Sequence, residues 1–303
     1  MNVLVTGASG FVGRHLVDFL FKKGANISSL GRSDAIHTSN FNLSYPWNSE
    51  EIFSVVEKVQ PDYFFHLIGN SNIKNYNDSL EVNFSLAKIL LKAIDHFDMK
   101  AKTKCLVFGS AAEYGLIEDD DLPISESFEC NPFSNYGKSK LLQTNYALDW
   151  AKKGGMIKVI RPFSIFGNSI PPYLAVGNFA YQIIELIDKG LNKGIITTGN
   201  INVRRDFIDV KDVIEICWRL VNVEKSNGGV FNVCSGQAIL LKTIIEYMSQ
   251  IAGIELQYEI NKSLLRNYDP LIHYGSNSKL IQIIGDYNFI PWEESVKNIM
   301  DVK

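Results

Sequence analysis

The sequence predicts an α/β fold with a doubly wound parallel sheet and a smaller carboxyl-terminal substrate-binding lobe. Short apolar runs rich in β-branched and aromatic residues alternate with amphipathic stretches through the first half of the chain. This alternation is typical of strand–helix–strand units, which build a parallel sheet with helices on both faces. A glycine-rich turn joins the first apolar run to the first amphipathic stretch. Beyond Arg161 the alternation loosens around Pro171 and Pro172, which indicates an inserted loop and a second lobe.

Each expected element follows from its local pattern. In the first amphipathic stretch the apolar positions 12, 16, 19 and 20 share one helical face, and Gly24 is expected to end that helix. The expected strands are 3–6, 26–30, 63–68, 105–109, 157–161 and 230–233. The expected helices are 12–23, 49–59, 80–97, 136–152, 179–189 and 209–221, before a final helical segment.

These elements predict two domains built from interleaved segments. Residues 1–164 and 206–234 are expected to form a dinucleotide-binding domain. Residues 165–205 and 235–303 are expected to form the substrate-binding lobe.

Composition excludes several classes of partner. The chain has 303 residues, 46% hydrophobic content and a formal net charge of −3, which offers no general attraction to nucleic acid or to anionic lipid. No apolar stretch is long enough to span a membrane, and Met1 leads directly into a strand-like run without room for a signal peptide. The four cysteines are far apart in the sequence, so we expect reduced thiols in a cytoplasmic protein and no metal site.

The turn from Gly7 to Gly13 predicts a Rossmann-type dinucleotide site. Its sequence, Gly-Ala-Ser-Gly-Phe-Val-Gly, follows a strand and opens a helix. Glycines let the backbone approach a pyrophosphate, and the free N–H groups of the helix start attract its negative charge. The spacing is G-x-x-G-x-x-G rather than G-x-G-x-x-G. The expected cofactor contacts here are Gly7, Ser9, Gly10, Phe11, Val12 and Gly13.

Arg32 favours NADP(H) over NAD(H). An NAD enzyme usually carries an acidic residue about twenty positions after the turn, at the end of the second strand, to hold the ribose hydroxyls. This chain has Arg32 and Ser33 there. A guanidinium and a hydroxyl hold a 2′-phosphate by charge-assisted hydrogen bonds, whereas an acid would repel it. The alternative is a solvated surface arginine.

Tyr136 and Lys140 are candidate catalytic residues because they lie four positions apart, on one face of an expected helix. At about 5 Å and an effective dielectric constant near 20, an ammonium favours a phenolate by roughly 3 kcal/mol. We therefore expect the pKa of Tyr136 to fall by about two units, into a range useful for acid–base chemistry. Ser110 follows the expected strand 105–109, where the hydroxyl would polarise a carbonyl at the ligand-binding edge of the sheet.

The turn, Ser110 and the Tyr136/Lys140 pair, in this order, resemble the extended short-chain dehydrogenase/reductase family of nucleotide-sugar enzymes. The resemblance covers nearly the whole chain. It includes His66-Leu67-Ile68-Gly69, Asn83, Arg161-Pro162-Phe163 with Gly167, and the runs 204–212 and 232–236.

The resemblance implies roles for these residues. Ser110 and Tyr136 would bind the sugar, and Lys140 would also hold the nicotinamide ribose. Further cofactor contacts are implied for Leu67, Ile68, Gly69, Asn83 and Phe163. A homodimer is also expected, through helices corresponding to 80–97 and 136–152.

The resemblance also implies an anion site. Arg205 and Arg266 would grip the diphosphate of the substrate with bidentate contacts. A family asparagine is replaced by Ser164, so its contact is weakened or reassigned to Asn178. For Arg205 the alternative is a salt bridge to Asp209.

The residues after Ser110 discriminate among reactions. Family members that dehydrate sugars carry acids in the two places after the triad hydroxyl, where this chain has Ala111 and Ala112. Bifunctional epimerase-reductases carry a cysteine at the place of Ala112. Glu113 is displaced by one position and is expected to point elsewhere.

Simple hydride transfer at one sugar carbon and internal redox epimerisation by a tightly held NAD remain, and Arg32 favours the first. The resemblance then implies an NADPH-dependent reductase acting on the 4-keto carbon of a GDP-linked keto-deoxy sugar. The alternatives are an NAD-dependent 4-epimerase or 4-dehydrogenase, and a non-catalytic module that senses NADP(H).

Overall fold

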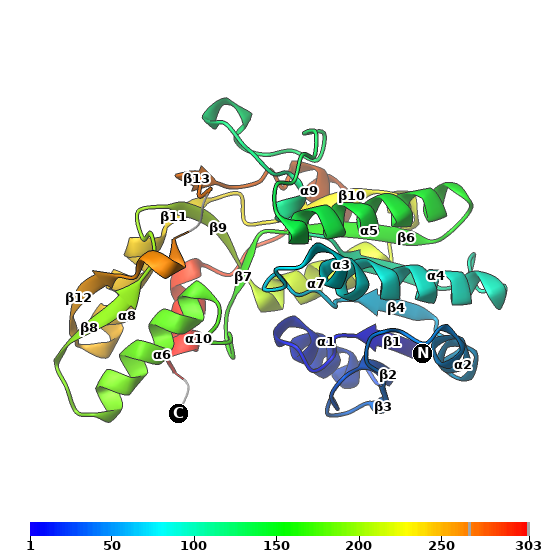
Figure 1. Cartoon of the computed structure of the whole chain (residues 1–303), viewed down its shortest axis with the longest axis horizontal. Helices are drawn as coiled ribbons and strands as arrows, with labels where there is room; N and C mark the ends of the chain where they lie inside the picture. Colours follow the sequence, from blue (N-terminus) through cyan, green and yellow to red (C-terminus); the bar gives the residue numbers. More distant parts are fainter. Residues whose placement is uncertain (266–267, 302–303) are drawn as a thin grey trace.

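A seven-stranded parallel sheet forms the larger part of the molecule in the computed structural model, which describes residues 1–265 and 268–301 (Figure 1). Its strand order is β10-β6-β5-β4-β1-β2-β3. The strands are β1 (Asn2–Thr6), β2 (Asn26–Gly31), β3 (Ser39–Asn42), β4 (Tyr63–His66), β5 (Lys104–Phe108), β6 (Ile157–Pro162) and β10 (Val230–Val233). All expected strands are present, and β3 is an additional edge strand.

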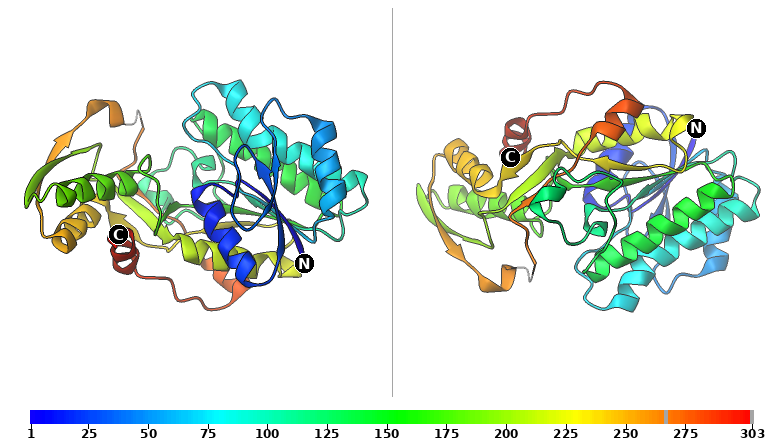
Figure 2. Two further views of the ribbon diagram at one scale, coloured as in Figure 1. Left: turned by 90° about the horizontal axis from the view of Figure 1, so that it is seen from below. Right: turned by 90° about the horizontal axis from the view of Figure 1, so that it is seen from above.

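Helices cover both faces of this sheet, which confirms the predicted doubly wound α/β fold (Figure 2). The helices α1 (Phe11–Lys22) and α7 (Val210–Val221) cover one face. The other face carries α2 (Ser49–Val59), α4 (Leu86–His96) and α5 (Asn135–Lys152).

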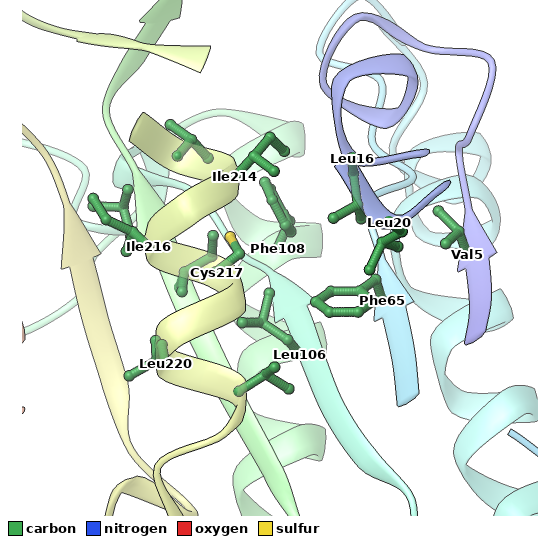
Figure 3. Packing of buried hydrophobic residues seen from close by; sticks show 14 of the residues in the cluster. Val5, Leu16, Leu20, Phe65, Leu106, Phe108, Ile214, Ile216, Cys217 and Leu220 are labelled. Carbon is green, nitrogen blue, oxygen red and sulfur yellow. The ribbon is translucent and has the colours of Figure 1, made fainter. Parts of the chain in front are cut away.

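Side chains alternate between the two faces of the large sheet along each strand, and this alternation separates two hydrophobic cores, one on each face. Val5 and Phe65 point to one face and pack with Leu16 and Leu20 of α1, and Leu106 on the same face packs beneath α7 (Figure 3). The intervening residues point the other way and pack against α2, α4 and α5; they include Leu4, Phe64, Cys105 and Val107. Every second residue of a strand faces the same side, so fully apolar strands serve both layers.

Smaller sheets form the remainder of the fold (Figure 1). In one, β9 (Arg204–Asp209) pairs with β7 (Ser164–Phe166), β11 (Ala238–Leu240) and β13 (Ile272–His273). In the other, β8 (Lys193–Thr198) pairs with β12 (Glu255–Ile260). Around them lie α6 (Ala175–Asp188), α8 (Leu241–Ala252) and α10 (Trp292–Met300), with their own buried cluster.

We propose that these two groups of elements are the two domains expected from the sequence. Separate buried clusters on the large sheet and in the lobe support the division. Some elements depart from the expected ranges. Residues 206–209 and Ser164, expected in the first domain, lie in β9 and β7 of a smaller sheet. The helix α9 (Ser278–Ile284), expected in the lobe, packs against α7 and β10 through Leu280. The chain therefore returns to the large sheet after β13.

The helical run over residues 76–96 is longer than the sequence predicts, and it is not uniform. It begins with α3 (Tyr76–Leu80), capped by the Asn75 side chain, and ends with α4. A π-helix, Glu81–Ser85, lies between them. π-helical turns are rare and often occur at functional sites.

No helix among the described residues is long and apolar enough to cross a membrane. The four cysteines are free thiols, and Cys105, Cys217 and Cys234 are buried.

Candidate active site at the carboxyl edge of the sheet

The candidate site lies where the strand order reverses. The chain passes from β1 to β2 on one side and later returns to β4 on the other side of β1. Ligands of doubly wound sheets bind at this switch point, outside the carboxyl ends of the strands. Gly7 follows β1 and Leu67 follows β4, so the two predicted cofactor segments lie on either side of the switch.

The glycine-rich turn fits a pyrophosphate. Gly7 has φ of +77°, which favours glycine, and its carbonyl accepts a hydrogen bond from Gly10 N at 3.0 Å. A Cβ on Gly13 would lie 2.0 Å from the Gly7 oxygen, so that position also requires glycine. Ser9 and Gly10 are exposed, and no side chain caps the helix start at Phe11. The backbone N–H groups there remain available for an anion.

Arg32 lies beyond the carboxyl end of β2, as predicted. Thr6 and Leu30 are paired in the sheet, so the glycine-rich turn and Arg32 leave neighbouring strands at the same edge. The Arg32 side chain is exposed.

Lys140 is held by the ends of two strands. Its Nζ donates to Ile68 O at 2.9 Å, to Phe108 O at 2.8 Å and to Gln143 Oε1 at 3.2 Å. The side chain is 1% exposed, and this burial lowers the pKa of Lys140 to about 7. Ile68 follows β4, and Phe108 ends β5. Lys140 therefore joins the helix α5 to the switch point.

The pKa of Tyr136 is shifted in the opposite direction to the one expected from the sequence. Ser134 caps α5, accepting from Gly137 N at 3.0 Å, and sets Tyr136 in the first turn of the helix. Burial raises the pKa of Tyr136 to about 12, against a lowering effect of the hydrogen bond with Ser110. We expected a lowered pKa from the neighbouring ammonium. Burial and the nearby Glu113 carboxylate set the direction instead, so the phenol is protonated near neutral pH.

Ser110 and Tyr136 are brought together as predicted. Ser110 follows β5 and its Oγ accepts from Ala112 N at 3.1 Å, which starts a short 3₁₀ turn, Ala111–Glu113. The hydrogen bond between Ser110 and Tyr136 joins the two hydroxyls. They form one polar surface at the end of β5.

Gly69 faces the triad. A Cβ built on Gly69 would lie 3.1 Å from Lys140 Nζ and 3.5 Å from Tyr136 Oη. The absence of a side chain at Gly69 therefore lets the backbone of this loop pack directly against Lys140 and Tyr136.

A methyl group at this position is therefore expected to impair both binding and turnover. Gly69→Ala places a carbon against Lys140, which must move by a few tenths of an ångström, and in van der Waals contact with Tyr136 Oη. We expect kcat/KM for the nicotinamide cofactor to fall about tenfold or more, since small misplacements of reacting groups are costly. Steady-state kinetics at varied cofactor concentration measure this loss. An unchanged kcat/KM in a correctly folded variant would contradict this placement of Gly69.

Asn83 anchors a loop of the site. It is fully buried in the π-helix and accepts from Asn70 N at 2.8 Å. Its Nδ2 donates to Ser79 Oγ and Ser139 Oγ, each at 3.0 Å. We predicted Asn83 as a cofactor contact. The structure shows it tying the loop after β4 to α5.

His66 was not predicted as a site residue. It ends β4, fully buried, with Nδ1 2.8 Å from Thr6 Oγ1. Burial, with a further contribution from nearby Lys140, lowers the pKa of His66 to about 3. A neutral imidazole therefore lies beside the ammonium. Its place at the end of an apolar strand was the only indication in the sequence.

The remaining predicted cofactor residues lie along the same edge. Leu67 and Ile68 continue from β4 and are partly buried. Phe163 follows β6, is largely buried, and has its ring 5.3 Å from that of His273.

The predicted substrate arginine, Arg205, lies in β9. It forms an ion pair with Asp269 and donates to Pro270 O at 2.8 Å. Asp209, the alternative partner, instead caps α7 by accepting from Lys211 N at 2.8 Å. Arg266 lies outside the described residues.

Two further residues bear on the substrate side. Asn178, in α6, donates to Pro172 O at 3.2 Å and accepts from Gln182 Nε2 at 2.6 Å. Tyr268, which was not predicted, exchanges two 3.0 Å hydrogen bonds with the backbone of Ile117. Its ring packs against Phe133, close in sequence to Tyr136. Tyr268 therefore links the segment that carries Asp269, the partner of Arg205, to the segments around Ile117 and Phe133.

Comparison with known proteins identifies the family. Residues 3–234 match the model of the NAD dependent epimerase/dehydratase family. The chain belongs to this family. Its members are the extended short-chain dehydrogenases/reductases, which use a nicotinamide cofactor, and the predicted resemblance is confirmed.

Individual members of the epimerase/dehydratase family are similar over almost the full length. A GDP-6-deoxy-D-mannose reductase of Pseudomonas aeruginosa is 28% identical, with 99% of this chain and 96% of the relative covered. A GDP-6-deoxy-D-talose 4-dehydrogenase of Aggregatibacter actinomycetemcomitans is 29% identical, with 95% and 93% covered. The structure of RMD from Pseudomonas aeruginosa complexed with NADPH superposes with a TM-score of 0.81 at 27% identity, covering 99% and 96%.

Proposed function

We propose that this chain is an NADPH-dependent reductase that acts on the 4-keto carbon of a GDP-linked keto-deoxy sugar. The observation that carries the proposal is the set of groups at the end of β5. Ser110 and Tyr136 present two hydroxyls there, while the following positions are Ala111 and Ala112. Glu113 is fully buried and paired with Arg161. A carboxylate held in that way is not available to remove a proton from the sugar.

The protein groups have distinct roles in this reaction. When bound, the nicotinamide supplies the hydride. Ser110 and Tyr136 donate hydrogen bonds to the carbonyl oxygen as negative charge develops on it. Tyr136 then delivers the proton. Its raised pKa of about 12 keeps the phenol protonated at neutral pH, which is the state that a proton donor needs.

Arg32 supports NADPH as the reductant. The exposed guanidinium lies at the end of β2, where an NAD enzyme usually has an acid. Arg205, one of the two predicted diphosphate contacts, lies in the lobe. The GDP-linked substrates in the names of the two relatives support the choice of base.

The decisive experiment supplies the enzyme with GDP-4-keto-6-deoxy-D-mannose and NADPH. The absorbance of the reduced nicotinamide should fall only when both are present, and NADH should support a lower rate. Matched UDP-linked and dTDP-linked 4-keto sugars test the base. Absence of turnover with every keto sugar, together with NADPH binding, would favour the sensing module. Bound NAD in the purified protein, with interconversion of 4-hydroxy sugars, would favour an epimerase or dehydrogenase.

Two further expectations stay predictions. They are the homodimer, through the surfaces of α4 and α5, and the cytoplasmic location.

A further inference from the structure

The buried carboxylate beneath the site connects three elements. Glu113 Oε1 accepts from Ser110 N at 2.9 Å and from Thr144 Oγ1 at 3.0 Å. Glu113 Oε2 pairs with Arg161 Nε at 2.9 Å. Ser110 follows β5, Thr144 lies in α5 and Arg161 lies in β6. One side chain therefore joins the serine segment, the catalytic helix and the neighbouring strand.

The placement of these partners relates them directly to the triad. Thr144 lies one helical turn after Lys140 on the same face of α5, and both are buried. The bond from Ser110 N fixes the segment that carries the serine hydroxyl. We infer that Glu113 is a positioning residue for the reductase reaction, because it sets the separation between the Ser110 hydroxyl and the face of α5 that carries Tyr136 and Lys140. This inference rests on the proposed function.

The surroundings of Glu113 are built to hold a charged carboxylate in one place. Arg161, the partner cation, lies with its guanidinium 4.7 Å from the centre of the Tyr114 ring. The Tyr114 hydroxyl donates to Asn232 Oδ1 at 2.6 Å. A Cβ on Gly109 would lie 2.3 Å from Glu113 Oε1, so the strand end leaves just enough space for the carboxylate. A buried ion pair contributes little net stability compared with apolar residues of the same volume, which points to a role in geometry.

Glu113 also acts on the site through its charge. The carboxylate raises the pKa of both Tyr136 and Lys140. Among the described residues, Ser110 and Ser139 also interact with Tyr136, His66 and Gln143 lie near Lys140, and Arg161 contacts Glu113 itself. Of these, His66 stays neutral, since burial lowers its pKa to about 3. Removing the negative charge would leave Arg161 unopposed, and the pKa of Tyr136 and Lys140 would fall.

Glu113→Gln tests the charge, and a thermal melt of each variant first confirms folding. The amide keeps the shape, and its single oxygen can still accept from Ser110 N and Thr144 Oγ1, while its NH2 group replaces the oxygen that accepts from Arg161. We expect the alkaline limb of the kcat/KM profile to move to lower pH by about one unit, because both proton-bearing groups lose their protons more easily. A limb that coincides with the wild-type limb would overturn the inference.

Thr144→Val tests the position without altering charge, with Thr144→Ser as the matched control. Valine removes one buried hydrogen bond to Glu113, so we expect kcat to fall roughly tenfold. The alkaline limb of the kcat/KM profile should stay at the wild-type pH. Serine keeps the hydroxyl and should restore turnover. Equal kcat values for the valine and serine variants would overturn the positioning role.

Failure of the proposed function gives a different result. If the wild-type chain reduces no 4-keto sugar, the affinity for NADPH is measured against pH by tryptophan fluorescence. Deprotonation removes the positive charge of Lys140 and one of its three N–H donors, so Glu113→Gln should shift the loss of affinity for NADPH to lower pH. An unshifted curve would overturn the role of Glu113 independently of any reaction.

Discussion

Replacing Tyr136 by phenylalanine is expected to lower kcat by about two to four orders of magnitude, the usual contribution of a positioned proton donor. The phenol joins the Ser110 hydroxyl at the end of β5, and burial raises the pKa of Tyr136 to about 12. Phenylalanine keeps the ring and its packing but removes the proton. Single-turnover measurement of NADPH oxidation separates this loss from slower product release.

The control for this variant is cofactor binding. The structure shows Lys140 held by Ile68 O, Phe108 O and Gln143, none of which depends on the phenol. NADPH should therefore bind to Tyr136→Phe with nearly wild-type affinity. Turnover above about a tenth of the wild-type rate would show that another group donates the proton.

The second large effect is expected at Arg32. Arg32→Ala should lower the ratio of kcat/KM for NADPH over NADH by about ten- to a hundredfold, the value of charge-assisted hydrogen bonds to a phosphate. The exposed side chain lies at the carboxyl end of β2, so the substitution is expected to leave the free energy of unfolding almost unchanged.

Ser33→Ala is the matched control for Arg32. It removes a neutral hydroxyl from the same loop and should change the cofactor ratio less. Steady-state kinetics with both cofactors provide the measurement. Equal losses for NADPH and NADH in Arg32→Ala would show that the arginine does not recognise the 2′-phosphate.

Local patterns sufficed for most of the fold. The apolar strands and the amphipathic helices were predictable because their periodicity matches the layer in which they lie. β3 was not predictable, because its sequence Ser-Asn-Phe-Asn is polar and only the edge of the sheet stabilises it. Pairing with β2 supplies hydrogen bonds that no local pattern reveals.

The chemistry of the triad was only partly predictable for the same reason. The spacing of Tyr136 and Lys140 placed them on one helical face correctly. The proton affinity of Tyr136 depends on burial by the whole fold, and the sequence-based estimate considered only the nearby ammonium. The acceptors of Lys140 are backbone carbonyls of Ile68 and Phe108, distant in sequence, and carbonyls carry no residue-type information.

For Glu113, the hydrogen-bond and ion-pair partners could not be predicted from the sequence. Its position after Ser110 led us to expect that it points elsewhere, and the structure shows it fully buried. Its partners, Thr144 and Arg161, come from two later elements. Spacing alone could not have joined them. Arg205 likewise pairs with Asp269 from a distant segment.

Because of the π-helix Glu81–Ser85, the number of residues in this helical run cannot change without moving Asn83. One residue corresponds to about 100° of rotation in an α-helix. Deleting a residue from the wide turn would restore ordinary helical hydrogen bonding, yet it would also rotate Asn83 away from Asn70, Ser79 and Ser139. The more regular helix would therefore release the loop that carries Gly69. The π-helical turn is less regular than an α-helix, but it is what keeps Asn83 in place to hold the loop of the site.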